Sequence, residues 1–139
     1  PEDRPAPAGD GSDLKHLNIW VIDDDDAVCL AMQTLLTSWG CTCHAAGSAE
    51  EALQCARTFE APFQAPDLII TDYRLRNEQT GKQVLQLLRA HWGASIPAII
   101  LTGDTSPQRL RDAQSTAAVL LHKPVSPSQL RETIAALAP

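Results

Sequence analysis

The chain has 139 residues, a length that suits a single domain with one hydrophobic core. Hydrophobic residues account for 44% of the sequence and charged residues for 20%, which is typical of soluble globular proteins. The formal net charge of -6 argues against direct nucleic-acid binding, and no apolar run approaches the ~20 residues that span a bilayer. Because no signal peptide is recognisable, the sequence predicts a cytoplasmic domain that makes no membrane contact of its own.

The N-terminal segment has the composition of a linker. Residues 1–13 are rich in Pro, Gly, Ala and acidic residues, and apolar side chains do not recur in them at a regular spacing. Such a segment cannot bury enough apolar surface to fold. Residues 1–16 are therefore predicted to be a disordered linker and residues 17–139 a folded domain. A linker in this place indicates that another domain precedes it in a longer parent chain.

The first predicted strand ends in four consecutive carboxylates. Residues 18–22 (NIWVI) form an apolar run typical of a strand buried on both faces of a parallel sheet, and residues 23–26 are all Asp. At ~4 Å and an effective dielectric of ~20, each close pair of these charges costs roughly 4 kcal/mol. A hard divalent cation with oxygen ligands would offset that cost. The alternative is a solvated acidic turn that caps the following helix.

Four more strand–helix units follow along the chain. The helix of the first unit is expected over about residues 27–39. The further strands are expected at residues 41–46, 67–71, 98–102 and 118–121, and their helices at about 49–59, 82–92, 107–115 and 127–137. Short apolar strands that alternate with amphipathic helices imply a parallel sheet covered on both faces. The predicted fold class is therefore α/β, a doubly wound (βα)5 sandwich.

Local signals support these helices. Ser48 and Glu51 have the spacing of a capping box, and Ser126 followed by Pro127 is typical of a helix start. On the first helix, the apolar residues that recur at helical spacing and are expected to face the core are Val28, Leu30, Ala31, Leu35 and Leu36.

The four cysteines do not form a recognisable metal motif. Cys41 and Cys43 are separated by one residue, whereas structural zinc sites usually show Cys-x2-4-Cys spacing and a second pair downstream. Cys29 and Cys55 fall at apolar helical positions, where a free thiol behaves as a small hydrophobe. We expect reduced cysteines, which agrees with a cytosolic compartment; a zinc site or a disulfide is the less favoured alternative.

In a parallel sheet the carboxyl ends of the strands lie at one edge, where such folds bind their ligands. The residues expected there are Asp23, Asp24, Asp72, Thr102 and Lys123. Asp23 and Asp24 could hold Mg2+, while Asp72 supplies a nucleophilic carboxylate oxygen. Lys123 could neutralise one oxygen of an incoming phosphoryl group, and Thr102 could donate a hydrogen bond to another. The expected product is an aspartyl phosphate.

Four motifs at these strand ends resemble the receiver domains of two-component response regulators. They are VIDDDD at residues 21–26, DLIITDYRL at 67–75, AIILTGD at 98–104 and LLHKP at 120–124. The resemblance extends over about residues 17–137, nearly everything outside the linker. It implies the flavodoxin-like fold of the single-domain chemotaxis regulator and a role as phosphoacceptor in a phosphorelay.

The resemblance also implies a role for each acidic residue of the site. Asp72 corresponds to the phosphoacceptor. Asp24 corresponds to a direct Mg2+ ligand, and Asp23 to a residue that helps to hold the metal through water. Arg74, two residues after Asp72, is expected to lend its backbone carbonyl to the metal.

The residues expected to contact the phosphoryl oxygens are Thr102 and Lys123, and the Lys123-Pro124 bond is commonly cis in this family. One feature departs from the family pattern. Receivers often carry an aromatic residue two or three positions before this Lys, where it rotates inward on phosphorylation. Leu120 and Leu121 occupy that region. The sequence therefore leaves open how Thr102 couples to the output face, the surface through which a receiver acts on its partner or attached domain.

The implied partner is a histidine kinase or a histidine-phosphotransfer domain, and dimerisation is left open. The domain would support its own phosphorylation and dephosphorylation without being a turnover enzyme, and would switch conformation to regulate a partner or an attached domain. Candidate contacts for the donor are Ala27, Val28, Ala31 and Met32 on the first helix. The parent chain is expected to be a hybrid sensor histidine kinase with this receiver at its C-terminus, with or without a membrane tether. A regulator that begins with the receiver is the alternative.

Two other functions compete with this interpretation. A degenerate receiver would act only as a protein-interaction module. A haloacid-dehalogenase-like phosphatase would use Asp23-x-Asp25 as its nucleophile motif, with Thr102 and Lys123 as its hydroxyl and Lys. It would need a further acidic pair after the Lys, where the sequence has only Glu132, and it would leave Asp72 without a role.

Overall fold

The computed structural model describes residues 17–58, 66–75, 80–93, 96–103 and 106–137. Within them, five parallel strands form one sheet in the order β2-β1-β3-β4-β5. The strands are β1 (Asn18–Ile22), β2 (Thr42–Ala46), β3 (Leu68–Asp72), β4 (Ala98–Thr102) and β5 (Val119–His122). The helices are α2 (Asp26–Ser38), α3 (Ala49–Thr58), α4 (Gly81–Trp92), α5 (Pro107–Ser115) and α6 (Pro127–Leu137). The doubly wound (βα)5 fold is thereby confirmed; the expected linker, residues 1–16, lies outside the described residues.

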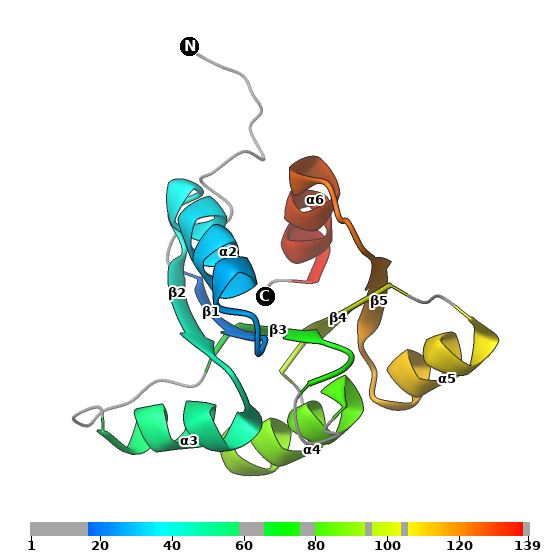
Figure 1. Ribbon diagram of the computed structural model, residues 1–139, viewed down its shortest axis with the longest axis horizontal. Helices are drawn as coiled ribbons and strands as arrows, with labels where there is room; N and C mark the ends of the chain where they lie inside the picture. Colours follow the sequence, from blue (N-terminus) through cyan, green and yellow to red (C-terminus); the bar gives the residue numbers. More distant parts are fainter. Residues whose placement is uncertain (1–16, 59–65, 76–79, 94–95, 104–105, 138–139) are drawn as a thin grey trace.

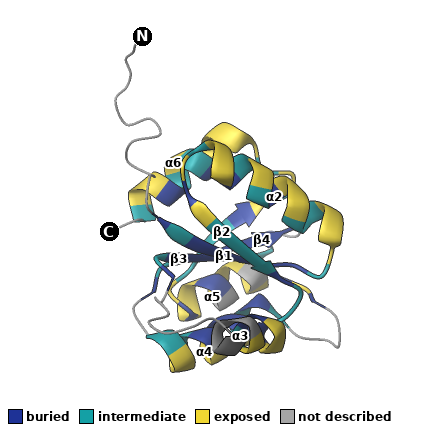
Figure 2. Cartoon of the chain, turned by 90° about the vertical axis from the view of Figure 1, so that its left-hand side faces the viewer, coloured by how far each residue is buried: buried dark blue, intermediate teal, exposed yellow. Residues whose placement is uncertain are grey.

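The helices cover the sheet on both faces, with α2 and α6 on one face and α3, α4 and α5 on the other (Figure 1). Successive residues of a strand point to opposite faces. Ile19 and Val21 of β1 therefore pack under α2 and α6, whereas Trp20 and Ile22 pack under α3, α4 and α5. Because both faces are covered, the central strands β1, β3 and β4 are almost entirely buried, which explains their continuous apolar sequences. Figure 2 shows that the exposed residues of α2 and α6 lie on the outward sides of these two helices.

The core face of α2 differs from the expected one. Leu30 is 65% exposed and Ala31 is exposed, whereas Met32 is buried. At 3.6 residues per turn, Leu30 lies roughly 200° round the helix from Val28 and so faces solvent. The residues of α2 and its C-cap that pack into the core between the sheet and the pair α2 and α6 are Val28, Met32, Leu35, Leu36 and Trp39. The prediction that Leu30 faces the core is wrong, and Met32 is a core residue rather than an exposed contact for a donor.

Two neighbouring residues of α4 offer a matched test of the packing. Leu88 is fully buried in the core under this helix, whereas Leu87 is 42% exposed. Leu88→Ala removes buried methyl groups and leaves a cavity, so we expect it to lower the free energy of unfolding by about 2–5 kcal/mol. Leu87→Ala makes the same change one residue earlier and should cost no more than about 1 kcal/mol. Urea unfolding measures both values, and equal losses would contradict the orientation of α4.

The described cysteines are free thiols. Cys41 is buried, and Cys29 and Cys43 are half-buried. Burial raises the pKa of Cys43 to about 12, and burial together with the charge of Asp23 raises the pKa of Cys29 to about 11. At neutral pH these two thiols are therefore protonated and weakly reactive. The side chain of Cys55 lies outside the described part of the chain.

Candidate functional site

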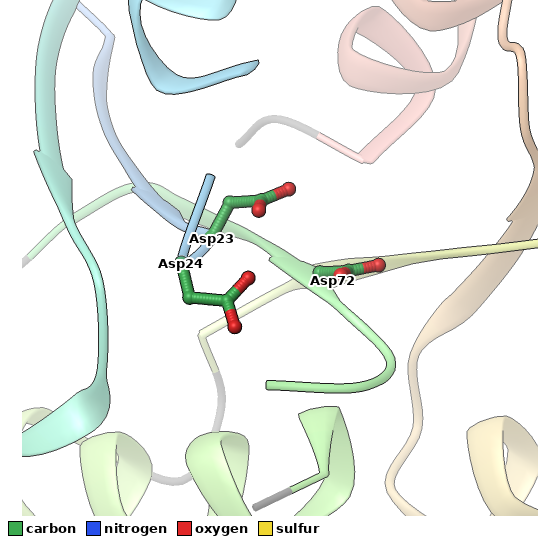
Figure 3. Close-up of side chains that lie close together, drawn as sticks. All are labelled: Asp23, Asp24 and Asp72. Carbon is green, nitrogen blue, oxygen red and sulfur yellow. The ribbon is translucent and has the colours of Figure 1, made fainter. Parts of the chain in front are cut away.

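Three carboxylates meet where β1 and β3 end. Asp23 and Asp24 follow β1, and Asp72 is the last residue of β3. Because Ile22 pairs with Thr71 across these adjacent strands, the residues that follow reach the same edge of the sheet. One oxygen from each of the three carboxylates lies within 4.8 Å of the others. Figure 3 shows the three side chains gathered at this edge.

The cluster concentrates negative charge at a partly buried position. Burial raises the pKa of Asp23, and the charges of Asp72 and Asp24 raise it further. The N–H of Asp25, which donates to Asp23 Oδ1 at 2.9 Å, and the charge of Lys123 act in the opposite direction. A cation would relieve the remaining repulsion. Three hard oxygen donors fit Mg2+, which is commonly bound by carboxylates, and they do not fit a metal that prefers thiolates.

Lys123, which directly follows β5, pairs with Asp72 across the end of β4. Lys123 Nζ lies 2.8 Å from Asp72 Oδ1, and the two side chains are 37% and 15% exposed. The backbone N–H of Lys123 donates to the carbonyl of Thr102 at 2.8 Å, which holds the end of β5 beside the end of β4. The peptide bond between Lys123 and Pro124 is cis, as the resemblance implies. The ammonium group is thus held over the carboxylate by two strands.

The segment after Asp72 is tied back to the start of α4. Arg74 pairs with Thr80 in a short antiparallel bridge, and the Gly81 N–H donates to the Tyr73 carbonyl at 2.7 Å. Thr80 caps α4, because its Oγ1 accepts from the N–H of Gln83 at 3.3 Å while the Gln83 side chain accepts from the N–H of Thr80 at 2.9 Å. This capping box was not predicted, although its Thr-x-x-Gln pattern is visible in the sequence.

The structure brings the sequence-predicted residues to one place. Thr102 is buried and lines a cavity of about 310 Å³ beside Asp72, Tyr73 and Arg74. The cavity lining, the carboxylate cluster and Lys123 all lie at one edge of the sheet. The predicted site residues assembled there are Asp23, Asp24, Asp72, Arg74, Thr102 and Lys123. Asp25 does not join them, because its carboxylate accepts from the Ala27 N–H at 2.9 Å and caps α2. This use of Asp25 weakens the phosphatase interpretation.

Comparison with known families agrees with this geometry. The sequence model of the response regulator receiver domain family matches residues 19–135, which is most of the chain. This chain belongs to the response regulator receiver domains. The receiver is 32% identical over 120 residues to the transcriptional regulatory protein ZraR of Escherichia coli K12, an alignment that covers 86% of this chain and 26% of ZraR. It is also 26% identical over 85 residues to the DNA-binding transcriptional regulator NtrC of Proteus hauseri, covering 61% of this chain and 16% of NtrC.

Solved receiver structures share the fold. The chemotaxis protein CheY4 of Vibrio cholerae superposes with a TM-score of 0.75 at 25% identity, covering 88% of this chain and 98% of CheY4. A response regulator receiver protein from Pseudomonas putida gives a TM-score of 0.72 at 28% identity, covering 86% of this chain and 95% of the other. The receiver therefore spans about a quarter of the ZraR relatives but nearly the whole of CheY4. Within the described residues, every helix is too short or too polar to cross a membrane.

Proposed function

We propose that this receiver accepts a phosphoryl group on Asp72 in a two-component phosphorelay. The observation that carries the proposal is the 2.8 Å contact between Asp72 Oδ1 and Lys123 Nζ beside the carboxylates of Asp23 and Asp24. Phosphoryl transfer to a carboxylate needs a nucleophilic oxygen and positive charge for the phosphoryl oxygens. Membership of the family implies a histidine kinase as phosphodonor partner. The donor group is proposed to be a phosphohistidine of such a kinase or of a histidine-phosphotransfer domain.

The side chains around Asp72 have separate parts in the proposed reaction. A carboxylate oxygen of Asp72 attacks the phosphorus atom, the bond from phosphorus to the donor imidazole nitrogen breaks, and its electron pair returns to the ring. The ammonium of Lys123 attracts one phosphoryl oxygen, and the hydroxyl of Thr102 donates to another. The same residues then stabilise the charge of the aspartyl phosphate.

The acidic cluster is proposed to hold Mg2+. The groups that would bind it are the carboxylates of Asp23, Asp24 and Asp72 and the backbone carbonyl of Arg74. When bound, Mg2+ supplies positive charge that offsets the repulsion between the cluster and an anionic phosphoryl group. Because Asp23 is 3% exposed, its charge is poorly screened by water, and phosphoryl transfer should depend strongly on the cation.

Phosphorylation is proposed to switch the conformation of the output face through β4 and β5. Thr102 pairs with His122, and Ile100 pairs with Leu120, so a shift of the end of β4 reaches β5 directly. Leu120 is half-buried against the core under α3, α4 and α5. The moving group would therefore be an aliphatic side chain in place of an aromatic one.

The parent chain is proposed to be a hybrid sensor histidine kinase in which the receiver occupies residues 17–139 and residues 1–16 are a linker. The Pro- and Ala-rich composition of that segment supports a connection to a preceding domain. The names of the relatives favour a transcriptional regulator as the alternative parent. In either case the receiver is proposed to work in the cytoplasm.

Mass spectrometry of the intact domain tests the proposed function. After incubation with phosphoramidate and Mg2+, we expect one added phosphoryl group that is stable in acid and labile to hydroxylamine. It should not form when a chelator is present from the start. An unmodified mass under all conditions would favour the interaction module. Catalytic turnover of phosphate esters without a covalent adduct on Asp72 would favour the phosphatase.

A further inference from the structure

Gly81 lies directly against the backbone of Asp72. A Cβ atom at this buried glycine would lie 2.9 Å from the carbonyl oxygen of Asp72, 3.2 Å from Thr71 Cγ2 and 3.4 Å from Tyr73 Cα. The first distance is shorter than real Cβ contacts allow, and the atom it meets belongs to the backbone. Gly81 has no positive φ that would call for glycine. The residue is therefore required for the space it leaves and not for its backbone freedom.

The peptide unit that Gly81 touches also holds the carboxylate of Asp72. The carbonyl of the Asp72–Tyr73 peptide faces Gly81 and accepts from Thr71 Oγ1 at 3.0 Å. The N–H of the same peptide lies 3.0 Å from Asp72 Oδ1 and 2.8 Å from the carbonyl of Leu101. Asp72 Oδ1 is also the oxygen that contacts Lys123 Nζ. A rotation of this peptide would therefore turn the carboxylate oxygen away from its partners.

The elements on either side of the contact are firmly held. The first turns of α4 are anchored by the capping box of Thr80 and Gln83 and by Val84 and Leu85, which are fully buried. On the other side, β3 lies between β1 and β4 and pairs with both. Asp72 is the last residue of β3, and within the described residues the peptide that follows it is held to the sheet by a single backbone bond, from the Tyr73 N–H to the carbonyl of Leu101. An added methyl group would displace this peptide more readily than the helix or the strand.

We propose that Gly81 is a positioning residue for Asp72. By leaving space for the Asp72–Tyr73 peptide, it fixes the direction in which the carboxylate oxygen faces Lys123 and an incoming phosphorus atom. Thr71 acts on the same peptide from the buried side through its hydroxyl. This inference rests on the proposed phosphoacceptor function and adds a specific geometric requirement to it.

The test compares Gly81→Ala with Gln86→Ala. Gln86 is an exposed residue of the same helix α4 and does not line the cavity beside Asp72. The rate of adduct formation is measured by intact mass over a range of phosphoramidate concentrations with saturating Mg2+. In Gly81→Ala we expect the maximal rate to fall by on the order of 10²-fold, since a displaced nucleophile is slow even when the donor is bound. The half-saturating phosphoramidate concentration should stay unchanged, and Gln86→Ala should match wild type in both values.

A second pair of variants keeps the test decisive if Gly81→Ala does not fold, which urea unfolding would reveal. Thr71→Val keeps the shape of the side chain but removes the hydroxyl, whereas Thr71→Ser keeps the hydroxyl. We expect Thr71→Val to lower the maximal rate at least several-fold and Thr71→Ser to restore most of it.

The outcomes separate the two proposals. Absence of an adduct on wild type would reject the phosphoacceptor function, and the positioning role would fall with it. A wild-type adduct would leave that function standing, and three results would then reject the positioning role alone. They are an unchanged maximal rate in a folded Gly81→Ala, an equal loss in Gln86→Ala, or equal rates in Thr71→Val and Thr71→Ser.

Discussion

Asp72→Asn is expected to abolish the phosphoryl adduct altogether. The amide keeps the shape of the side chain but removes the negative charge that makes the carboxylate oxygen nucleophilic. It also removes the charge partner of Lys123, whose ammonium lies 2.8 Å from Asp72 Oδ1. The lysine is 37% exposed and water can solvate it, so the free energy of unfolding should change little. Intact mass after incubation with phosphoramidate and Mg2+ measures the adduct, and urea unfolding measures the stability.

Asp67→Asn is the matched control for this variant. Asp67 lies immediately before β3, at the opposite end of the strand from Asp72, and its carboxylate accepts from the Asn18 N–H at 2.8 Å. Asp67→Asn removes the same negative charge at the far end of β3, so the phosphoryl adduct on Asp72 should still form. An adduct that persists in Asp72→Asn would mean that another carboxylate accepts the phosphoryl group, and peptide mapping after reduction of the acyl phosphate would locate it.

Lys123→Met is expected to slow adduct formation by about 10²–10³-fold. In enzymes, removing one preorganised group that stabilises transition-state charge has a cost of this size, equivalent to about 2.7–4 kcal/mol in the barrier. Methionine keeps an unbranched side chain of similar length without the ammonium. The backbone bond from Lys123 N–H to the carbonyl of Thr102 does not involve the side chain and should persist. The initial rate of the mass shift at saturating Mg2+ measures the effect.

Lys82→Met on α4 controls for the loss of a positive charge elsewhere in the domain and should react at the wild-type rate. If Lys123→Met reacted as fast as Lys82→Met, the contact between Lys123 and Asp72 would be a resting ion pair without a part in transfer. If both variants were slow, a general effect of net charge on the approach of the anionic donor would explain the result. Repeating the measurements at high salt separates these cases, because salt screens only the long-range effect.

Several elements could be predicted from the sequence with their observed bounds. The strand over residues 98–102 is a five-residue apolar run, and the helix over residues 107–115 begins at a proline in its first turn. Ser126 also acts as predicted, since its Oγ accepts from the Gln129 N–H at 3.1 Å. These signals are local, because a turn residue or a cap works through its nearest neighbours in the chain.

The predicted hydrogen-bond partner of Glu51, the core face of α2 and the roles of the site residues are less fully confirmed. Ser48 Oγ accepts from the Glu51 N–H at 3.1 Å as a capping box requires, but the Glu51 carboxylate accepts from the N–H of Gly47 instead of Ser48. The expected core face of α2 was wrong at Leu30, because a run of mixed apolar residues is compatible with several faces until the helix docks. The roles of the site residues stay predictions, although the structure assembles Asp23, Asp24, Asp72 and Lys123 at one edge.

The order of strands and helices along the chain, and the edge at which the charged residues gather, could be predicted before the fold was known. Short apolar runs that alternate with amphipathic segments allow few arrangements other than a covered parallel sheet, and the carboxyl ends of parallel strands share one edge. The burial of Met32 instead of Leu30, and the close approach of Gly81 to the peptide of Asp72, become visible only in the folded domain. These features depend on how elements distant in the sequence dock, to within a few tenths of an ångström, and no local pattern of residues encodes that distance.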